Sequence, residues 1–140
     1  MPCQTSFKRK HQTGEFPEGY NPTMEVQAHA PPWNTTAGYL DMTLWEIPDS
    51  TELSASSYDA LKHADVAFIL SDACNESTLN HKLHDATHDS LPIVMCGNKA
   101  DKVEGGPYSK PELIQHEYYD TSAETNLNLD EPWFTYSGNY

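Results

Sequence analysis

A chain of 140 residues suffices for one ordinary domain but not for a catalytic domain with a separate regulatory one. Its 21 Asp and Glu against 8 Lys and Arg give a formal net charge of −13, and such a surface repels phosphate backbones and anionic lipids. Composition therefore excludes a nucleic-acid groove and a polybasic membrane anchor, and we expect neither nucleic acid nor a membrane among the partners.

Cysteine content and hydropathy indicate the compartment. Three cysteines cannot all pair within one chain, and no apolar run near the N-terminus is long enough for a signal peptide. No run approaches the ~18 apolar residues of a membrane span, and no C-terminal cysteine is present to accept a prenyl group. We therefore expect a reducing compartment, in which Cys74 and Cys96 pack as small hydrophobic side chains beside buried strands.

The first half of the chain predicts a helix and a long hairpin. The basic segment 5–11 predicts a short helix that ends at Gly14. Residues 25–30 and 39–45 alternate apolar and polar side chains, as half-buried strands do, and two prolines at 31–32 end the first run. Their spacing predicts a hairpin. The side chains expected on the buried faces are Val26, Ala28 and Ala30 in the first strand and Leu40, Met42 and Leu44 in the second.

The second half predicts parallel strands joined by a helix. The continuous apolar runs 66–70 and 93–96 are typical of strands buried on both faces of a parallel sheet. Residues 77–90 carry apolar side chains at helical spacing, so strand, helix and strand predict a right-handed crossover and an α/β fold. The other predicted elements are a weak helix or an irregular segment over 54–63, a turn of helix over 111–116 and a final strand over 118–120.

A candidate binding motif, Gly97-Asn98-Lys99-Ala100-Asp101, follows the second buried run, at the strand end where doubly wound sheets bind ligands. An Asn-Lys-x-Asp turn suits guanine, because the aspartate accepts two N–H donors from the base edge and the lysine stem lies along the base plane. The later Thr121-Ser122-Ala123 places a backbone N–H for the 6-oxo group. The candidate base-binding residues are Asn98, Lys99, Asp101, Ser122 and Ala123. The same string also fits a polar turn before an ordinary helix start.

These blocks resemble the Ran family of small GTPases, and the similarity covers about residues 5–134 of one single domain. Two blocks, 92–101 and 118–123, are specific to Ran among small GTPases. The other matching residues are Lys10-His11, Thr13-Gly14-Glu15-Phe16, Tyr20, Thr23, Leu44-Trp45, Asn126 and Asn128. Residues 16–23 look more like the Rho branch, but the C-terminal lipidation cysteine usual in Rho proteins is missing here.

The resemblance implies a Ras-like P-loop NTPase fold with a doubly wound, mostly parallel sheet. It implies GTP or GDP with Mg²⁺ as cofactors, and Thr5 and Thr23 as metal ligands. It also implies nuclear transport factors as partners, namely importin-type carriers and an exchange factor, and a location in nucleus and cytoplasm. Residues 103–115 hold one lysine against two glutamates, so we expect binding to acidic carriers to be weakened.

The phosphate-binding half of the family pattern is missing. A family member opens with a buried strand and the phosphate loop G-x-x-x-x-G-K-[ST], whereas here Gln4 aligns with the loop lysine and Thr5 with the magnesium-binding hydroxyl. We expect the first strand and, beyond Phe134, the last helix to be absent. Strands 39–45 and 66–70, which would flank the first strand, must then pair directly or leave a gap.

The second switch, the segment that follows Trp45, also differs from the family pattern. Asp49 replaces the glycine that senses the γ-phosphate, and Ser50 replaces the glutamine that positions the attacking water. Glu46 keeps a carboxylate near the expected metal, while Glu124 adds a negative charge close to Asp101. We therefore expect GTP hydrolysis to be impaired or absent and nucleotide binding to be weak or absent.

Three functions stay open on this sequence: a Ran-like guanine nucleotide-binding protein, a nucleotide-free pseudo-GTPase interaction module, and a truncated family member without a function of its own. Two clusters have a structural and a functional interpretation. His81, His84 and His88 share a helix face that suits either Zn²⁺ or Ni²⁺ or plain solvent. Aromatic side chains near the C-terminus suit either core packing or a binding patch. They are Tyr118, Tyr119, Trp133, Phe134 and Tyr136.

Overall fold

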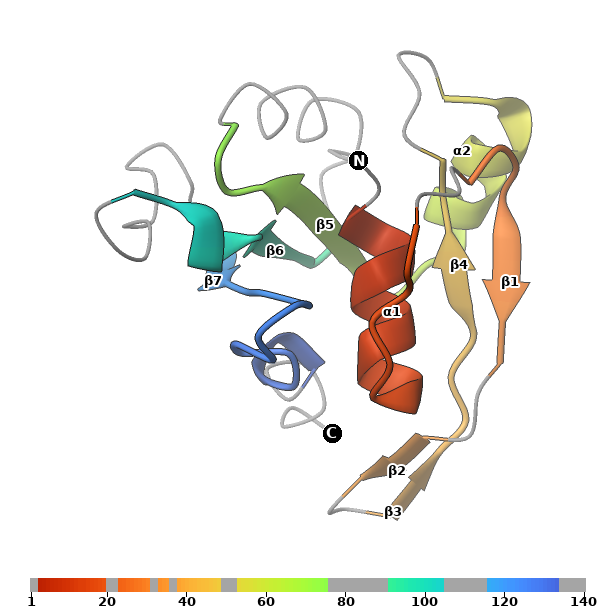
Figure 1. Ribbon diagram of the computed structural model, residues 1–140. Coiled ribbons are helices and arrows are strands. Elements are labelled where there is room, and N and C mark those ends of the chain that lie inside the picture. Colours follow the sequence, from red (N-terminus) through yellow and green to blue (C-terminus); the bar gives the residue numbers. More distant parts are fainter. Residues whose placement is uncertain are drawn as a thin grey trace.

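The computed structural model describes residues 3–19, 23–30, 33–35, 38–48, 53–75, 91–104 and 116–133. Two helices with defined bounds, seven short strands and one 3-10 turn lie in these ranges, and residues 131–133 are helical as well. Figure 1 shows how these elements are arranged. In chain order they are α1 (Cys3–Thr13), β1 (Gln27–His29), β2 (Trp33–Thr35), β3 (Gly38–Leu40), β4 (Leu44–Glu46), α2 (Ala55–Lys62), β5 (Ala67–Asp72), β6 (Ile93–Asn98), η1 (Ala100–Lys102) and β7 (Glu117–Asp120). No described helix has the length and apolar character needed to cross a membrane.

The two helices are those that the sequence predicts. α1 ends at Gly14, which adopts a left-handed φ of 73° and donates its N–H to the Lys10 carbonyl at 2.9 Å. α2 begins after Ser54, whose hydroxyl accepts the Ser57 N–H at 3.2 Å as an N-cap. It ends at His63, so the weak helix expected over 54–63 is confirmed.

The long hairpin is also confirmed. β1 pairs with β4 and β2 pairs with β3, both antiparallel, and the two ladders keep one common register. In the first strand Val26 is partly buried as expected, but the prediction is wrong for Ala28 and Ala30, which are exposed, while His29 is partly buried. His29 turns inward because its ring meets a cluster of charged and hydroxyl groups against Glu46, described below. In the second strand Met42 is partly buried as expected.

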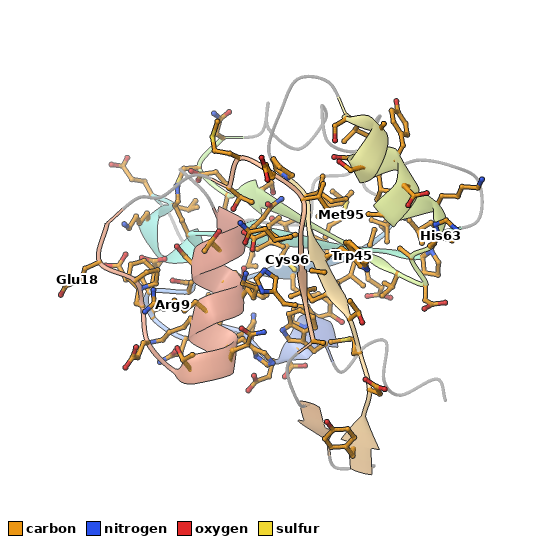
Figure 2. The ribbon with its side chains drawn as sticks, turned by 90° about the vertical axis from the view of Figure 1, so that its right-hand side faces the viewer. Arg9, Glu18, Trp45, His63, Met95 and Cys96 are labelled. Atoms are coloured by element: carbon orange, nitrogen blue, oxygen red, sulfur yellow. The ribbon has the colours of Figure 1, made fainter. Side chains whose placement is uncertain are left out.

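The predicted parallel sheet consists of β5, β6 and β7, in that order. β6 is its central strand and is buried along its whole length, which explains why its sequence is continuously apolar. Figure 2 shows Met95 and Cys96 in the interior, where each is 0 % exposed, whereas Glu18 lies at the rim. The crossover helix expected over 77–90 and the turn over 111–115 lie outside the described residues.

Aromatic side chains close the core beneath α1. Trp133 packs on Phe7 and Phe68, with ring centroids 6.2 Å and 4.5 Å apart respectively. Tyr118 and Tyr119 are partly buried against the same sheet. The core interpretation of the aromatic cluster is therefore confirmed for these three residues, while its last two members, at 134 and 136, lie outside the described part of the chain.

Cys74 and Cys96 differ in their exposure. Burial raises the pKa of the Cys96 thiol to about 12, and its packing role is confirmed. The expectation for Cys74 is wrong, because it lies exposed in the turn after β5, beyond the sheet. We expect iodoacetamide at pH 8 to alkylate Cys74 in the folded protein and Cys96 only after unfolding, as peptide mapping by mass spectrometry would show. Equal labelling of both in buffer would contradict this core.

The hairpin and the parallel sheet remain two separate sheets in the described ranges, since β4 does not pair with β5. The sequence left two arrangements open for these strands, direct pairing or a gap between them, and the structure has the gap.

Candidate functional site

The predicted base site lies at the carboxyl end of β6, and Asn98 holds it together. Asn98 is only 3 % exposed, and its Oδ1 accepts the Ala123 N–H at 3.1 Å. Its carbonyl accepts the Ala73 N–H at 2.8 Å. One residue thus joins the turns that follow β5, β6 and β7. Ser122 is fully buried beside it, with its N–H donated to the Leu127 carbonyl at 3.0 Å.

A backbone N–H of Thr121-Ser122-Ala123 is expected to face the 6-oxo oxygen of guanine, and the Ala123 amide is the one bonded to Asn98. In this structure it is donated to Asn98, so recognition of a 6-oxo group requires the Asn98 side chain to release it. The preceding amides are also engaged, since Thr121 N–H is donated to the Gly97 carbonyl at 2.9 Å. The backbone N–H groups at the carboxyl end of β6 and in 121–123 therefore already have hydrogen-bond partners within the protein.

Gly97 is required at this corner by the close approach of Tyr118. A Cβ added at Gly97 would lie 2.1 Å from the Tyr118 hydroxyl oxygen, which is far inside van der Waals contact. That hydroxyl donates to the Asp120 carboxylate at 3.1 Å, while burial raises the pKa of Asp120. The glycine before Asn98 is therefore explained by packing between β6 and β7.

Lys99 adopts a left-handed φ of 64°, which directs the chain into η1. Its Nζ lies 2.5 Å from the Asp72 carboxylate at the end of β5. Burial alone would raise the pKa of Asp72, but the hydrogen bonds from Lys99 and from the Cys74 amide outweigh it and lower that pKa. The lysine expected along the base plane is thus held by an acid that sequence reasoning missed. The sequence alone places Asp72 just beyond the neighbouring apolar run 66–70, at the same end of the sheet as Lys99.

Asp101 lies exposed in η1, apart from the buried Asn98 and Ser122. The negative charge expected nearby from Glu124 is balanced by Lys102, whose Nζ lies 2.9 Å from the Glu124 carboxylate. The hydrogen bond with Glu124, and then the neighbouring charge of Asp101, raise the pKa of Lys102. Of the five predicted base-site residues, the structure brings Asn98, Ser122 and Ala123 together, holds Lys99 on Asp72 and leaves Asp101 exposed.

A second cluster forms where α1 faces β4. Thr5 and Thr23, the predicted metal ligands, lie with their Oγ1 atoms 3.1 Å apart. Both hydroxyls donate to Oε1 of Glu46, the Thr23 bond being 2.8 Å long. Glu46 is 6 % exposed, so the structure buries its carboxylate with both threonines on it.

Lys8 supplies the positive charge in this cluster. Its Nζ lies 2.5 Å from Glu46 Oε2 and 2.9 Å from His29 Nε2. Burial alone would raise the pKa of Glu46, but the hydrogen bonds from Lys8, Thr5 and Thr23 outweigh it and hold that pKa below its ordinary value. Sequence reasoning missed Lys8. Its position one helical turn after Thr5 places both residues on one face of α1, but its partner Glu46 lies 38 residues away in the chain.

Lys8 decides whether the cluster fits a divalent cation. The oxygens of Thr5, Thr23 and Glu46 are hard ligands of the kind that Mg²⁺ prefers. The Lys8 ammonium, however, lies against the same carboxylate, and a second cation beside it would be repelled. With Lys8 in place the cluster does not fit Mg²⁺. No group of three or more His, Cys, Asp and Glu side chains stands ready for a metal elsewhere in the described ranges, which exclude the histidines of 77–90.

The lowered pKa of Glu46 has a consequence for stability. A carboxyl whose folded pKa lies below its ordinary value of 4.5 stabilises the fold above that pH, and this contribution is lost as the pH falls through the folded pKa. We expect the urea midpoint of unfolding to decrease as the pH is lowered from 5 to 3, measured at intervals of about half a pH unit. In Glu46→Gln this decrease should be smaller, because the carboxyl that titrates is gone. Asp72→Asn controls for the other lowered carboxyl. A Glu46→Gln profile parallel to the parent's would contradict the ion pair.

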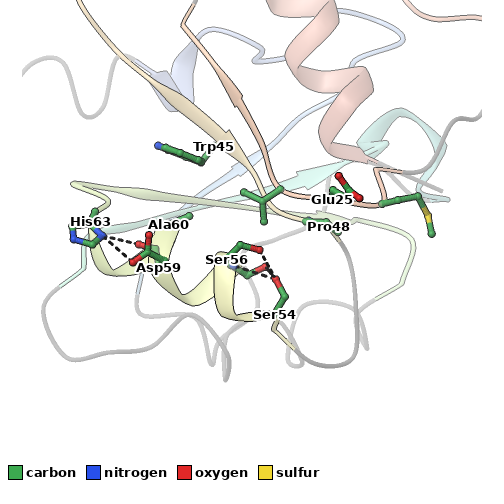
Figure 3. Close-up of a pocket in the computed structure, with 11 residues that line it drawn as sticks. Glu25, Trp45, Pro48, Ser54, Ser56, Asp59, Ala60 and His63 are labelled. Carbon is green, nitrogen blue, oxygen red and sulfur yellow. Dashed lines mark hydrogen bonds and ion pairs between the residues drawn. The ribbon is translucent and has the colours of Figure 1, made fainter.

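A hollow of about 910 Å³ lies between α2 and the end of β4. Figure 3 shows His63 bonded to Asp59 and Ser54 bonded within the N-terminal turn of α2. These polar groups serve the helix, and none of the predicted site residues lines the hollow. It therefore does not coincide with the predicted base-binding residues.

Comparison with known families identifies the domain. A model of the Ras family matches residues 3–138, nearly the whole chain. The parallel sheet, the Asn98 corner and the α1 helix that carries Thr5 are arranged in accordance with such a domain. The chain belongs to the Ras family of small GTPases, whose members bind GTP or GDP together with Mg²⁺.

Proposed function

We propose that this chain is a Ran-like protein of nucleocytoplasmic transport that binds its carriers without a GTPase cycle. The observation that carries the proposal is the Lys8 ammonium on Glu46, in the place where a GTPase of this family needs a metal ion. The Ran-like blocks 92–101 and 118–123 support the subfamily. Importin-type carriers and an exchange factor are the proposed partners, in nucleus and cytoplasm.

Loss of hydrolysis follows from two independent groups of residues. In these GTPases the γ-phosphate is sensed by a backbone glycine and attacked by a water that a glutamine orients. Asp49 and Ser50 occupy those sequence positions. In addition, Lys8 excludes the metal that would neutralise charge in the transition state. Restoring either group alone would leave the other defect.

The switch region is held by the protein itself. Switch segments of GTPases are ordinarily ordered by contacts with the γ-phosphate and Mg²⁺ and released on hydrolysis. Here Thr23, in the first switch, donates to a carboxylate that Lys8 neutralises. Its position therefore does not depend on a nucleotide. This contact favours the pseudo-GTPase interaction module among the functions that the sequence leaves open.

Weak guanine nucleotide binding remains a second candidate. Asp101 is exposed and Asn98 is in place, so a base could enter if Asn98 released the Ala123 amide. The pinning of Lys99 by Asp72 opposes such binding, since the lysine stem must cover the base.

A pull-down with an importin-type carrier separates these functions. We expect the chain to retain the carrier more weakly than an ordinary Ran family member does, and equally with GTP, GDP or EDTA. Retention that rises with GTP and Mg²⁺ would restore the nucleotide-dependent function. No retention in any condition would contradict the transport role.

A further inference from the structure

The last turn of α1 places a histidine against the segment 129–133. His11 stacks on the Trp133 indole, with ring centroids 5.1 Å apart and 25° between the ring planes. Its Nδ1 lies 2.9 Å from the Asp130 carboxylate. Phe7, one helical turn earlier on α1, stacks on the same indole. Two side chains of α1 therefore hold Trp133, and one of them can take up a proton near neutral pH.

Asp130 and Trp133 meet His11 together because they belong to one helical turn. The backbone N–H of Trp133 is donated to the Asp130 carbonyl at 3.1 Å. Leu129 and Pro132 of the same segment are buried. In Figure 1 this segment, drawn in blue, lies beside the C-terminal end of α1. The contact with His11 thus joins the first helix to the last described residues of the chain.

Burial and Asp130 act in opposite directions on a proton at His11. The His11 side chain is only 14 % exposed, and burial disfavours a charged ring. Asp130 favours the charged ring, but its own side chain is 68 % exposed, so water weakens the attraction. Burial has the larger effect, and the pKa of His11 lies below its ordinary value of 6.5. At neutral pH the packed ring is therefore uncharged.

The charged groups on the three elements around Trp133 and His11 are Lys8, Arg9 and Lys10 of α1, Asp130 and Glu131 of the segment 129–133, and Asp72 of β5. Lys8 is paired with Glu46 and Arg9 with Glu15. Asp72 holds Lys99. Asp130 is the acid whose carboxylate lies at ion-pair distance from the His11 ring. A charge on His11 therefore acts first on Asp130 and on the indole beside it.

We propose that His11 is a pH-sensitive contact between α1 and the segment 129–133, which packs on Trp133 when neutral and leaves the indole for water when protonated. The surface that this contact covers belongs to the core cluster of Phe7, Leu129 and Phe68. Mild acid therefore loosens one side of the core without unfolding the parallel sheet. This goes beyond the carrier role and does not depend on it.

The sign of the effect follows from the lowered pKa of His11. A histidine that binds its proton less readily in the folded state stabilises the packed segment fully above pH 6.5. This contribution decreases as the pH falls below 6.5 and levels off below the folded pKa. Glu46 and Asp72 titrate below the ordinary values of carboxyl groups, so their effect on stability belongs to a more acidic range.

Proton–nitrogen spectra of the full chain, recorded between about pH 7.5 and pH 5, test the proposal through the indole signal of Trp133. We expect this signal to shift with a midpoint below pH 6.5 that coincides with titration of the His11 ring. We also expect hydrogen exchange of the Trp133 backbone amide, corrected for its intrinsic dependence on pH, to rise about threefold or more. An indole signal that stays constant over this range would overturn the proposal.

His11→Gln should abolish the shift of the Trp133 signal, because glutamine does not titrate. It also separates this shift from the titration of Asp120, whose pKa is raised. His63→Gln is the matched control, since His63 forms a similar pair with Asp59 but is 71 % exposed on α2. We expect His63→Gln to leave the shift unchanged. A shift that persists in His11→Gln would overturn the proposal.

Asp130→Asn decides the question if His11→Gln does not fold. Asparagine removes the negative charge that favours the protonated ring. The midpoint of the Trp133 shift should therefore move to lower pH, by about 0.3 of a pH unit or more. A midpoint that stays in place or moves to higher pH would show that the shift does not report on His11, and would contradict the proposed contact.

Discussion

Lys8→Met is expected to lower the free energy of unfolding by about 3–5 kcal/mol, because it leaves the buried Glu46 carboxylate without its counter-charge. The lysine and glutamate side chains are only 13 % and 4 % exposed, so the loss of the ammonium leaves a largely desolvated carboxylate. A domain of this size commonly has about 5–15 kcal/mol in total. Urea unfolding followed by circular dichroism measures the change.

The double variant Lys8→Met with Glu46→Gln distinguishes the ion pair from packing. Glutamine keeps acceptors for Thr5 and Thr23 and needs no counter-charge. We therefore expect the double variant to recover most of the stability that Lys8→Met loses. Lys102→Met breaks an exposed lysine–glutamate pair and should not move the midpoint measurably. Additive losses in the double variant would contradict the pairing.

Magnesium supplies a second test of the same cluster. Without Lys8, the oxygens of Thr5, Thr23 and Glu46 remain, and a divalent cation can replace the missing charge. We expect millimolar Mg²⁺ to raise the midpoint of Lys8→Met but not that of the parent chain, since only a ligand bound by the folded state stabilises it. An equal response of both proteins would show that Lys8 does not occupy the cation's place.

Local patterns predicted most of the described fold. Helix α1, the hairpin and the three parallel strands each follow from a run of side chains and its end signals, such as Gly14. The inward turn of His29 did not follow, because its cause is an ion pair between α1 and β4, 38 residues apart in the chain. A pattern within one strand carries no information on such a contact.

The candidate site also contains residues whose roles could be predicted from the sequence and residues whose roles could not. Asn98 and Ala123 could be predicted, because a spaced motif fixes both and the parallel register of β6 and β7 brings them together. The role of Lys8 could not, since a lysine on a basic helix suggests solvent rather than a buried carboxylate. Asp72 could be placed at a strand end from the sequence, but its bond to Lys99 depends on the register of β5 with β6.

Nucleotide affinity is expected to fall far below that of an intact small GTPase. A phosphate loop supplies several charge-assisted hydrogen bonds of about 1.5–3 kcal/mol each, and here Gln4 aligns with the lysine of that loop. Losing three such bonds removes roughly 4.5–9 kcal/mol, on the order of three to six decades in the dissociation constant. Calorimetric titration with GDP and Mg²⁺ measures it, and GTP hydrolysis should be undetectable in the same preparation.

The residual affinity should come from the base corner alone, so its dependence on Asp101 is the control. Asp101→Asn is expected to abolish any preference for guanine over other bases and to leave the fold unchanged, because the side chain lies exposed in η1. Unfolding of Asp101→Asn would show that the residue is structural. A dissociation constant below about 1 μM in the parent, some 8.2 kcal/mol of binding, would exceed what a base corner supplies, and would mean that α1 and Gln4 hold phosphate after all.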